Sequence, residues 1–174
     1  MPSKLRSFLA AVLMVFSYAA HAQLSIEITG AGASKFPVAI PIFENEGALP
    51  RSVSDVIRAD LERSGLFSLV NLGLVTLPEH VAPDLAALRE RGADAVLTGS
   101  VIPLSDGRMD VRFRLFDSQR QTELGAMALR MAPSQYRVTG HRIADFVYEK
   151  LTGQPGYFST RIAYVVKTGQ RYEL

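Results

Sequence analysis

The chain has 174 residues, enough for about one domain at roughly 100–200 residues each. Its hydrophobic content of 48% and charged content of 21% exclude collagen-like, coiled-coil and intrinsically disordered classes. Cysteine is absent from the chain, which excludes a disulfide framework, a thiolate nucleophile and a cysteine-based zinc site. The formal net charge of +2 gives, by itself, a slightly basic protein.

The first 22 residues have the pattern of a secretory signal peptide, with a positive start, an apolar run and a small-residue cleavage motif. These parts are, in order, Lys4 and Arg6, the run from Phe8 to Phe16, and Ala20-His21-Ala22. The run is shorter than the about 20 apolar residues that a membrane-spanning helix needs. We therefore predict cleavage between Ala22 and Gln23.

Cleavage would remove two basic residues and no acidic ones, leaving 17 of each. A neutral mature chain offers no electrostatic basis for a nucleic-acid partner. We expect the mature protein in the periplasm, without a membrane-spanning segment.

The new amino terminus carries a short strand pattern. Leu24-Ser25-Ile26-Glu27-Ile28-Thr29 alternates apolar and polar residues, and the small residues 30–34 that follow are typical of a hinge. A terminal strand has free N–H and C=O groups along at least one side. It can pair within its own sheet or add to the sheet edge of another protein, and the pattern alone leaves both open.

The rest of the chain alternates strand and helix patterns. Helix 52–64 begins with Ser52, a capping residue with Asp55 three positions later, and stops at Gly65. Asp106-Gly107 is typical of a hairpin turn. The predicted strands are 36–43, 66–70, 95–102, 108–117, 122–131 and 161–166, and the predicted helices are 52–64, 84–91 and 133–151.

This order predicts an α/β fold, a mixed β-sheet with two to three packed helices. The strand 95–102 is apolar on both faces, which favours a central position in the sheet. The last predicted strand, 161–166, has no obvious partner and is expected to be an orphan at the C-terminal end.

Residues that could support catalysis or ligand binding are few. His141 and Asp145 are four residues apart and share a helix face, so an exported hydrolase using His141 is one alternative. Arg108, Arg112 and Arg114 form a row on one face of a strand, so an anionic-ligand-binding domain is another. The more ordinary interpretations are a structural histidine and a solvated sheet face. We predict no catalytic residue, cofactor or metal site.

Several stretches resemble the TolB family of Tol-Pal system periplasmic proteins. The most specific is GHRIADFVYEKLTG at 140–153, which continues through 158–165, and the shorter matches are 41–43, 59–67 and 92–99. The similarity covers essentially the whole mature chain. It implies a non-enzymatic interaction module that supports outer-membrane integrity and invagination during cell division.

The resemblance also implies a domain organisation and partners. It implies a signal peptide over 1–22, a partner-binding strand and hinge over 23–34, an α/β domain over 35–158 and a truncated start of a β-propeller over 159–174. In the family the amino-terminal strand binds TolA, an inner-membrane protein, which assigns that contact here to Leu24, Ser25, Ile26, Glu27, Ile28 and Thr29. The lipoprotein Pal binds the propeller, so Pal binding is expected only if a propeller is present.

Overall fold

The computed structural model describes residues 35–161, 166–169 and 171–173. The predicted signal peptide, its cleavage site at Ala22 and Gln23, and the predicted strand 24–29 lie outside the described residues. These predictions, and the domain boundaries that depend on them, therefore stay predictions. Among the described residues, no helix combines the length and apolar character that crossing a bilayer requires.

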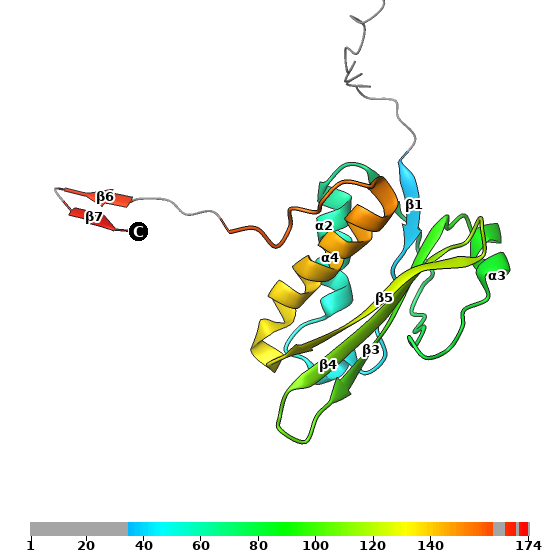
Figure 1. The fold of residues 1–174 in the computed structure, drawn as a ribbon, viewed down its shortest axis with the longest axis horizontal. Helices are drawn as coiled ribbons and strands as arrows, with labels where there is room; N and C mark the ends of the chain where they lie inside the picture. The colour runs from blue at the N-terminus through cyan, green and yellow to red at the C-terminus, as the bar shows by residue number, and fades with distance from the viewer. Residues whose placement is uncertain (1–34, 162–165, 170, 174) are drawn as a thin grey trace, which may run out of the picture. The chain divides into compact units, whose positions relative to one another are not determined.

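A five-stranded mixed sheet forms the body of the described domain, in the order β2-β1-β3-β4-β5 (Figure 1). β1 (Phe36–Ala39) lies parallel between β2 (Phe67–Leu69) and β3 (Ala95–Pro103). β3 then pairs antiparallel with β4 (Met109–Asp117), which pairs antiparallel with β5 (Thr122–Met131). The predicted mixed sheet and the central position of β3 are thereby confirmed.

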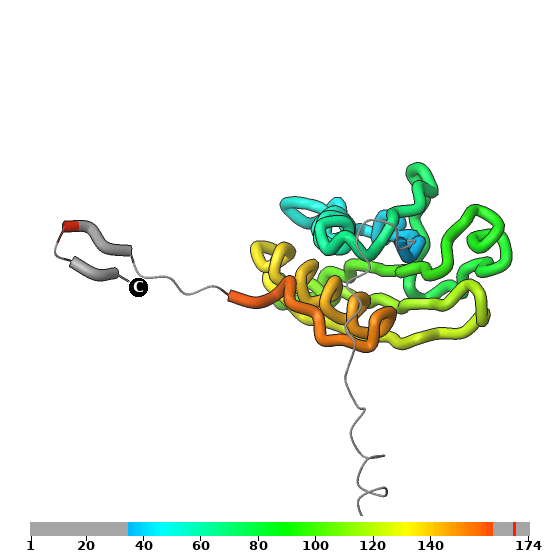
Figure 2. Tube along the Cα trace, turned by 90° about the horizontal axis from the view of Figure 1, so that it is seen from above, coloured from blue at the N-terminus to red at the C-terminus, as the bar shows by residue number. Residues whose placement is uncertain are grey.

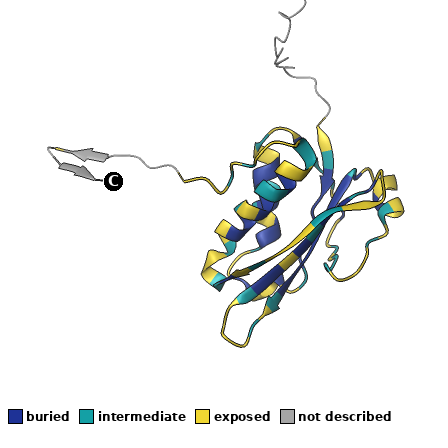
Figure 3. Ribbon diagram, in the orientation of Figure 1, coloured by how far each residue is buried: buried dark blue, intermediate teal, exposed yellow. Residues whose placement is uncertain are grey.

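Helices cover both faces of this sheet. α2 (Val53–Arg63) and α4 (Tyr136–Thr152) contact each other and bury the larger core against one face, whereas α3 (Leu85–Glu90) covers part of the other. Figure 2 shows the same arrangement turned by 90°. In Figure 3 the buried residues gather along β3 and on the inward sides of α2 and α4. The alternation of strand side chains explains this division, because Leu97 belongs to the larger core and the adjacent Val96 to the smaller one.

The strand predicted over 36–43 is shorter in the structure. β1 ends at Ala39, and beyond it Ile42 and Glu44 make only isolated bridges, to Thr76 and Ser100. Pro41 follows the end of the strand and has no N–H to donate to a ladder, which accounts for the early end.

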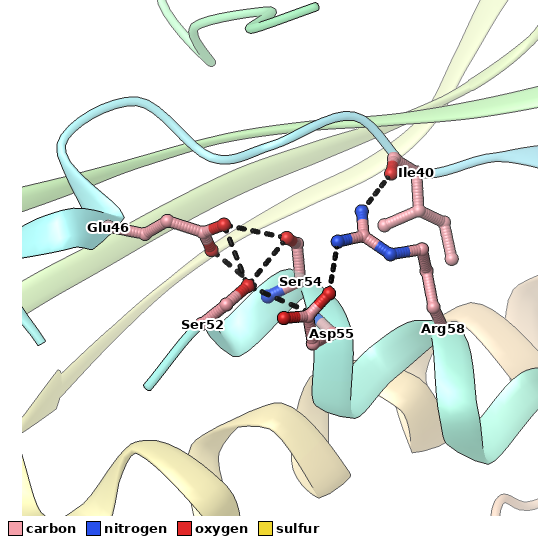
Figure 4. Close-up of polar contacts among 6 residues, drawn as sticks. All are labelled: Ile40, Glu46, Ser52, Ser54, Asp55 and Arg58. Carbon is pink, nitrogen blue, oxygen red and sulfur yellow. Dashed lines mark hydrogen bonds and ion pairs between the residues drawn. The ribbon is translucent and has the colours of Figure 1, made fainter. Parts of the chain in front are cut away.

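A buried carboxylate anchors the start of α2 (Figure 4). Glu46, in the 3-10 turn η2 (Glu46–Ala48), is only 6% exposed. It accepts hydrogen bonds from Ser52 Oγ at 2.7 Å, from the backbone N–H of Ser54 at 3.1 Å and from Ser54 Oγ at 2.8 Å. The turn before the helix and its first residues are therefore held as one unit.

Ser52 also caps the helix, as predicted. Its hydroxyl accepts the backbone N–H of Asp55 at 3.1 Å. The carboxylate of Asp55 does not complete a capping box but pairs with Arg58, whose guanidinium also donates to the Ile40 carbonyl at 2.6 Å (Figure 4). Arg58 thus ties α2 to the chain just beyond β1.

Replacing Glu46 with alanine is expected to lower the free energy of unfolding by about 2 kcal/mol, because the buried N–H and hydroxyl of Ser54 lose their acceptor. Urea unfolding measures the effect. The matched control is Glu62→Ala on the exposed side of α2, which is expected to change stability by less than about 0.5 kcal/mol. Equal losses in the two variants would contradict the anchoring role of Glu46.

The remaining helix and turn predictions are confirmed, apart from the start of the last helix. Asp84 caps α3, and Gly153 ends α4 with a positive φ of 74°. The hairpin between β3 and β4 turns at Gly107, whose φ is 81°. The predicted helix start at Pro133 is a 3-10 turn, η3 (Pro133–Gln135), which leads into α4.

The described residues near the C-terminus form, by themselves, a small antiparallel hairpin of β6 (Val166–Thr168) and β7 (Arg171–Glu173). One strand over 161–166 was predicted here. Arg161 lies outside any strand, residues 162–165 lie outside the described residues, and Val166 opens β6. β6 is therefore not the unpaired strand that the sequence predicted, because β7 pairs with it along its whole length.

Candidate functional site

His141 lies between the two long helices. Its Nδ1 is 2.5 Å from Oδ2 of Asp60, a residue of α2 that is only 3% exposed. Asp60 also accepts a hydrogen bond from Arg63 at 3.1 Å. Among the described residues, no serine or threonine hydroxyl forms a hydrogen bond with His141. The contact therefore links α4 to α2. It does not supply the nucleophile that a hydrolase using His141 would need.

Asp145 does not pair with His141, although the two are four residues apart on one face of α4. Its carboxylate accepts the backbone N–H groups of Phe158 at 2.6 Å and Ser159 at 3.1 Å. It therefore fastens the segment that follows α4 back onto the helix. The dyad that the spacing suggested is not formed, because each side chain has a partner on a different element.

The arginine row on β4 is largely neutralised by neighbouring acids. Arg108 pairs with Asp106, Arg112 with Asp110 at 2.8 Å, and Arg114 with Glu123. The hydrogen bond from the Arg108 side chain holds the pKa of Asp106 below its usual value, and the same contact raises the pKa of Arg108. Because each of these arginines has a carboxylate partner, the row offers little uncompensated charge to an anionic ligand.

A groove of about 660 Å³ runs between α2 and the first turns of α4, and we call it the α2–α4 groove. The helices approach closely here because Gly140 faces Val56: a Cβ on Gly140 would lie 2.7 Å from the Cβ of Val56. The groove is lined by Arg51, Ser52, Asp55, Val56, Ala59, Arg63, Tyr136, Arg137 and His141.

The charged residues of this groove are not among the predicted site residues, although the sequence contains a signal for them. Asp55, Ala59 and Arg63 recur every four residues within α2, and Arg137 and His141 are four apart within α4. Such spacings place side chains on one helix face. The pairing of the two faces is a tertiary contact, which helix spacing does not predict.

No group of three or more metal-ligating side chains occurs in the part of the chain that the structure describes. The predicted partner-binding residues, Leu24 to Thr29, are not among those described, so the structure does not test them. The α2–α4 groove is one of several hollows that the described residues line.

The family model and the similar proteins found by comparison agree on one family. The family model for the TolB amino-terminal domain matches residues 24–124. The chain is 73% identical to the Tol-Pal system protein TolB of Aromatoleum aromaticum over 99% of this chain, and 51% identical to that of Polaromonas naphthalenivorans over 91%. It spans about two-fifths of the length of these relatives, 40% and 37% respectively.

A solved structure agrees with this relationship. The crystal structure of TolB from Acinetobacter baumannii superposes with a TM-score of 0.66 at 31% sequence identity, covering 79% of this chain and 33% of that one. The fold and the sequence thus point to the same relatives. The chain belongs to the TolB family.

Proposed function

We propose that this chain acts as a non-enzymatic protein–protein interaction module of the Tol-Pal envelope complex in the periplasm. The observation that carries the proposal is the match of residues 24–124 to the TolB amino-terminal domain, together with relatives named as Tol-Pal system proteins. Its role would be to support outer-membrane integrity and invagination during cell division. A Pal-like lipoprotein belongs to the proposal only where a β-propeller accompanies this domain.

The proposed contact is strand pairing between Leu24–Thr29 and a TolA-like inner-membrane protein. The family match begins at Leu24, so these residues fall within the matched domain. Their apolar–polar alternation is suited to β-augmentation, in which backbone hydrogen bonds supply affinity and alternate side chains supply register.

Removing Gln23–Thr29 is expected to weaken binding to the C-terminal domain of a TolA-like protein at least tenfold in calorimetry. The thermal unfolding of the chain is expected to stay the same, because the buried cores that the described residues form begin at Val38. Unchanged affinity would refute the proposal.

A proline scan over Ser25, Ile26, Glu27 and Ile28 tests the strand mechanism itself. Neighbouring N–H groups of a strand point to opposite sides, and proline removes one of them. We expect affinity to fall about tenfold at alternate positions only, either Ser25 and Glu27 or Ile26 and Ile28. A uniform effect, or none, would show that backbone pairing does not hold the partner.

A further inference from the structure

We propose that the α2–α4 groove binds an acidic peptide segment of a partner protein, at a surface separate from the amino-terminal strand. Three arginines line the groove, Arg51, Arg63 and Arg137, against a single carboxylate, Asp55. Asp55 is already paired with Arg58. The groove therefore presents positive charge on a mature chain whose acidic and basic residues are otherwise balanced.

The arginines of the groove are available to a ligand. Arg51 and Arg137 are exposed, and among the described residues neither side chain has a hydrogen-bond or ion-pair partner. Arg63 contacts Asp60 but its side chain is still 69% exposed. Guanidinium groups bind carboxylates through paired hydrogen bonds, which suits aspartate and glutamate side chains. The arginines of the β4 row each have a carboxylate partner, whereas Arg51 and Arg137 have none among the described residues.

The length of the groove favours a peptide over a small anion. Arg51 precedes α2 and Arg63 is its last residue, and the 11 residues of α2 span roughly 16 Å at 1.5 Å per residue. An extended peptide of about five or six residues covers that distance at roughly 3.3 Å per residue. A single phosphate ion would contact only one end of it.

The other lining residues suit a peptide backbone and mixed side chains. Val56 and Ala59 supply small apolar contacts along α2, and Tyr136 adds an aromatic ring from α4. His141 uses Nδ1 for Asp60, which leaves Nε2 as the ring nitrogen that a ligand can contact. The groove thus combines charge at its ends with apolar contacts between them.

Fluorescence anisotropy with labelled hexaglutamate tests the proposal on the whole chain at physiological ionic strength. The double variant Arg51→Glu, Arg137→Glu is expected to bind hexaglutamate at least tenfold more weakly than the parent. The matched control is Arg89→Glu, Arg91→Glu at α3, which makes the same change in net charge at exposed positions on the other face of the sheet. The control is expected to change affinity less than twofold, and thermal unfolding verifies that both variants fold.

Five results would overturn the proposal, and four of them concern the peptide. They are no binding of hexaglutamate, equal losses in the two double variants, equally tight binding of hexaglutamine, or displacement of the peptide by an equal concentration of inorganic phosphate. Self-association of the chain through the groove, seen in sedimentation and lost in the Arg51→Glu, Arg137→Glu variant, would also overturn it by making a second copy the occupant. Removing Gln23–Thr29 is expected to leave hexaglutamate binding unchanged, so this proposal and the strand-pairing proposal fail separately.

Discussion

Replacing Gly99 with alanine is expected to lower the free energy of unfolding by about 3 kcal/mol. A Cβ at this position would lie 2.4 Å from two carbon atoms of the Phe43 ring. Phe43 is only 1% exposed, so its ring has no solvent to move into. Gly99 also lies in β3, the central strand, whose backbone is paired with β4 at this point and cannot shift freely. Overpacking of this kind typically costs 1–3 kcal/mol, and the rigid surroundings favour the upper end.

Thermal unfolding measures this effect, as a fall in melting temperature of roughly 10 °C. Gly47→Ala is the matched control, because nothing lies within 4 Å of a Cβ at that position. It is expected to change stability by less than about 0.5 kcal/mol. Combining Gly99→Ala with Phe43→Leu should recover part of the loss, since the flexible leucine can give way. Similar melting temperatures for the two alanine variants would show that Phe43 does not confine Gly99.

The elements that sequence patterns predicted well are those with local signals at their ends. Ser52 and Asp84 accept backbone N–H groups at the starts of α2 and α3, and Gly153 provides the positive φ that ends α4. The Asp106-Gly107 turn likewise sets the β3–β4 hairpin, from which the register of the two strands follows. In each case the residue type carries the structural preference within a few positions of where it acts.

What the sequence could not predict depends on contacts between distant residues. The partner of His141 is Asp60, 81 positions away, rather than Asp145, the neighbour that helix spacing suggested. The length of β1 was overestimated because apolar residues continue past Ala39, although Phe43 packs on Gly99 instead of extending the ladder. The α2–α4 groove also depends on a contact between distant residues. The arginine-bearing faces of the two helices lie side by side only because Gly140 packs against Val56.

Asp145 was considered for its position on one helix face with His141, and its contacts in the structure give it a different and testable role. Its carboxylate holds the backbone of Phe158 and Ser159, and Gly156 packs directly against it. A Cβ on Gly156 would lie 2.3 Å from the Cα of Asp145, so only glycine allows this approach. Nearby, the rings of Tyr148 and Phe158 contact each other edge to face. The segment 154–160 is therefore fastened to α4 by both hydrogen bonds and packing.

Asp145→Ala is expected to release this segment, because two hydrogen bonds to a charged acceptor are lost and each is worth about 1.5–3 kcal/mol. Hydrogen exchange at the amides of Phe158 and Ser159 should accelerate about a hundredfold, equivalent to about 3 kcal/mol of local stability. Gly156→Ala should produce the same acceleration by steric displacement, whereas Glu149→Ala, at an exposed position of the same helix, should not. If exchange stays slow in both Asp145→Ala and Gly156→Ala, the aromatic contacts alone hold the segment, and neither the Asp145 carboxylate nor the close approach of Gly156 is needed to fasten it.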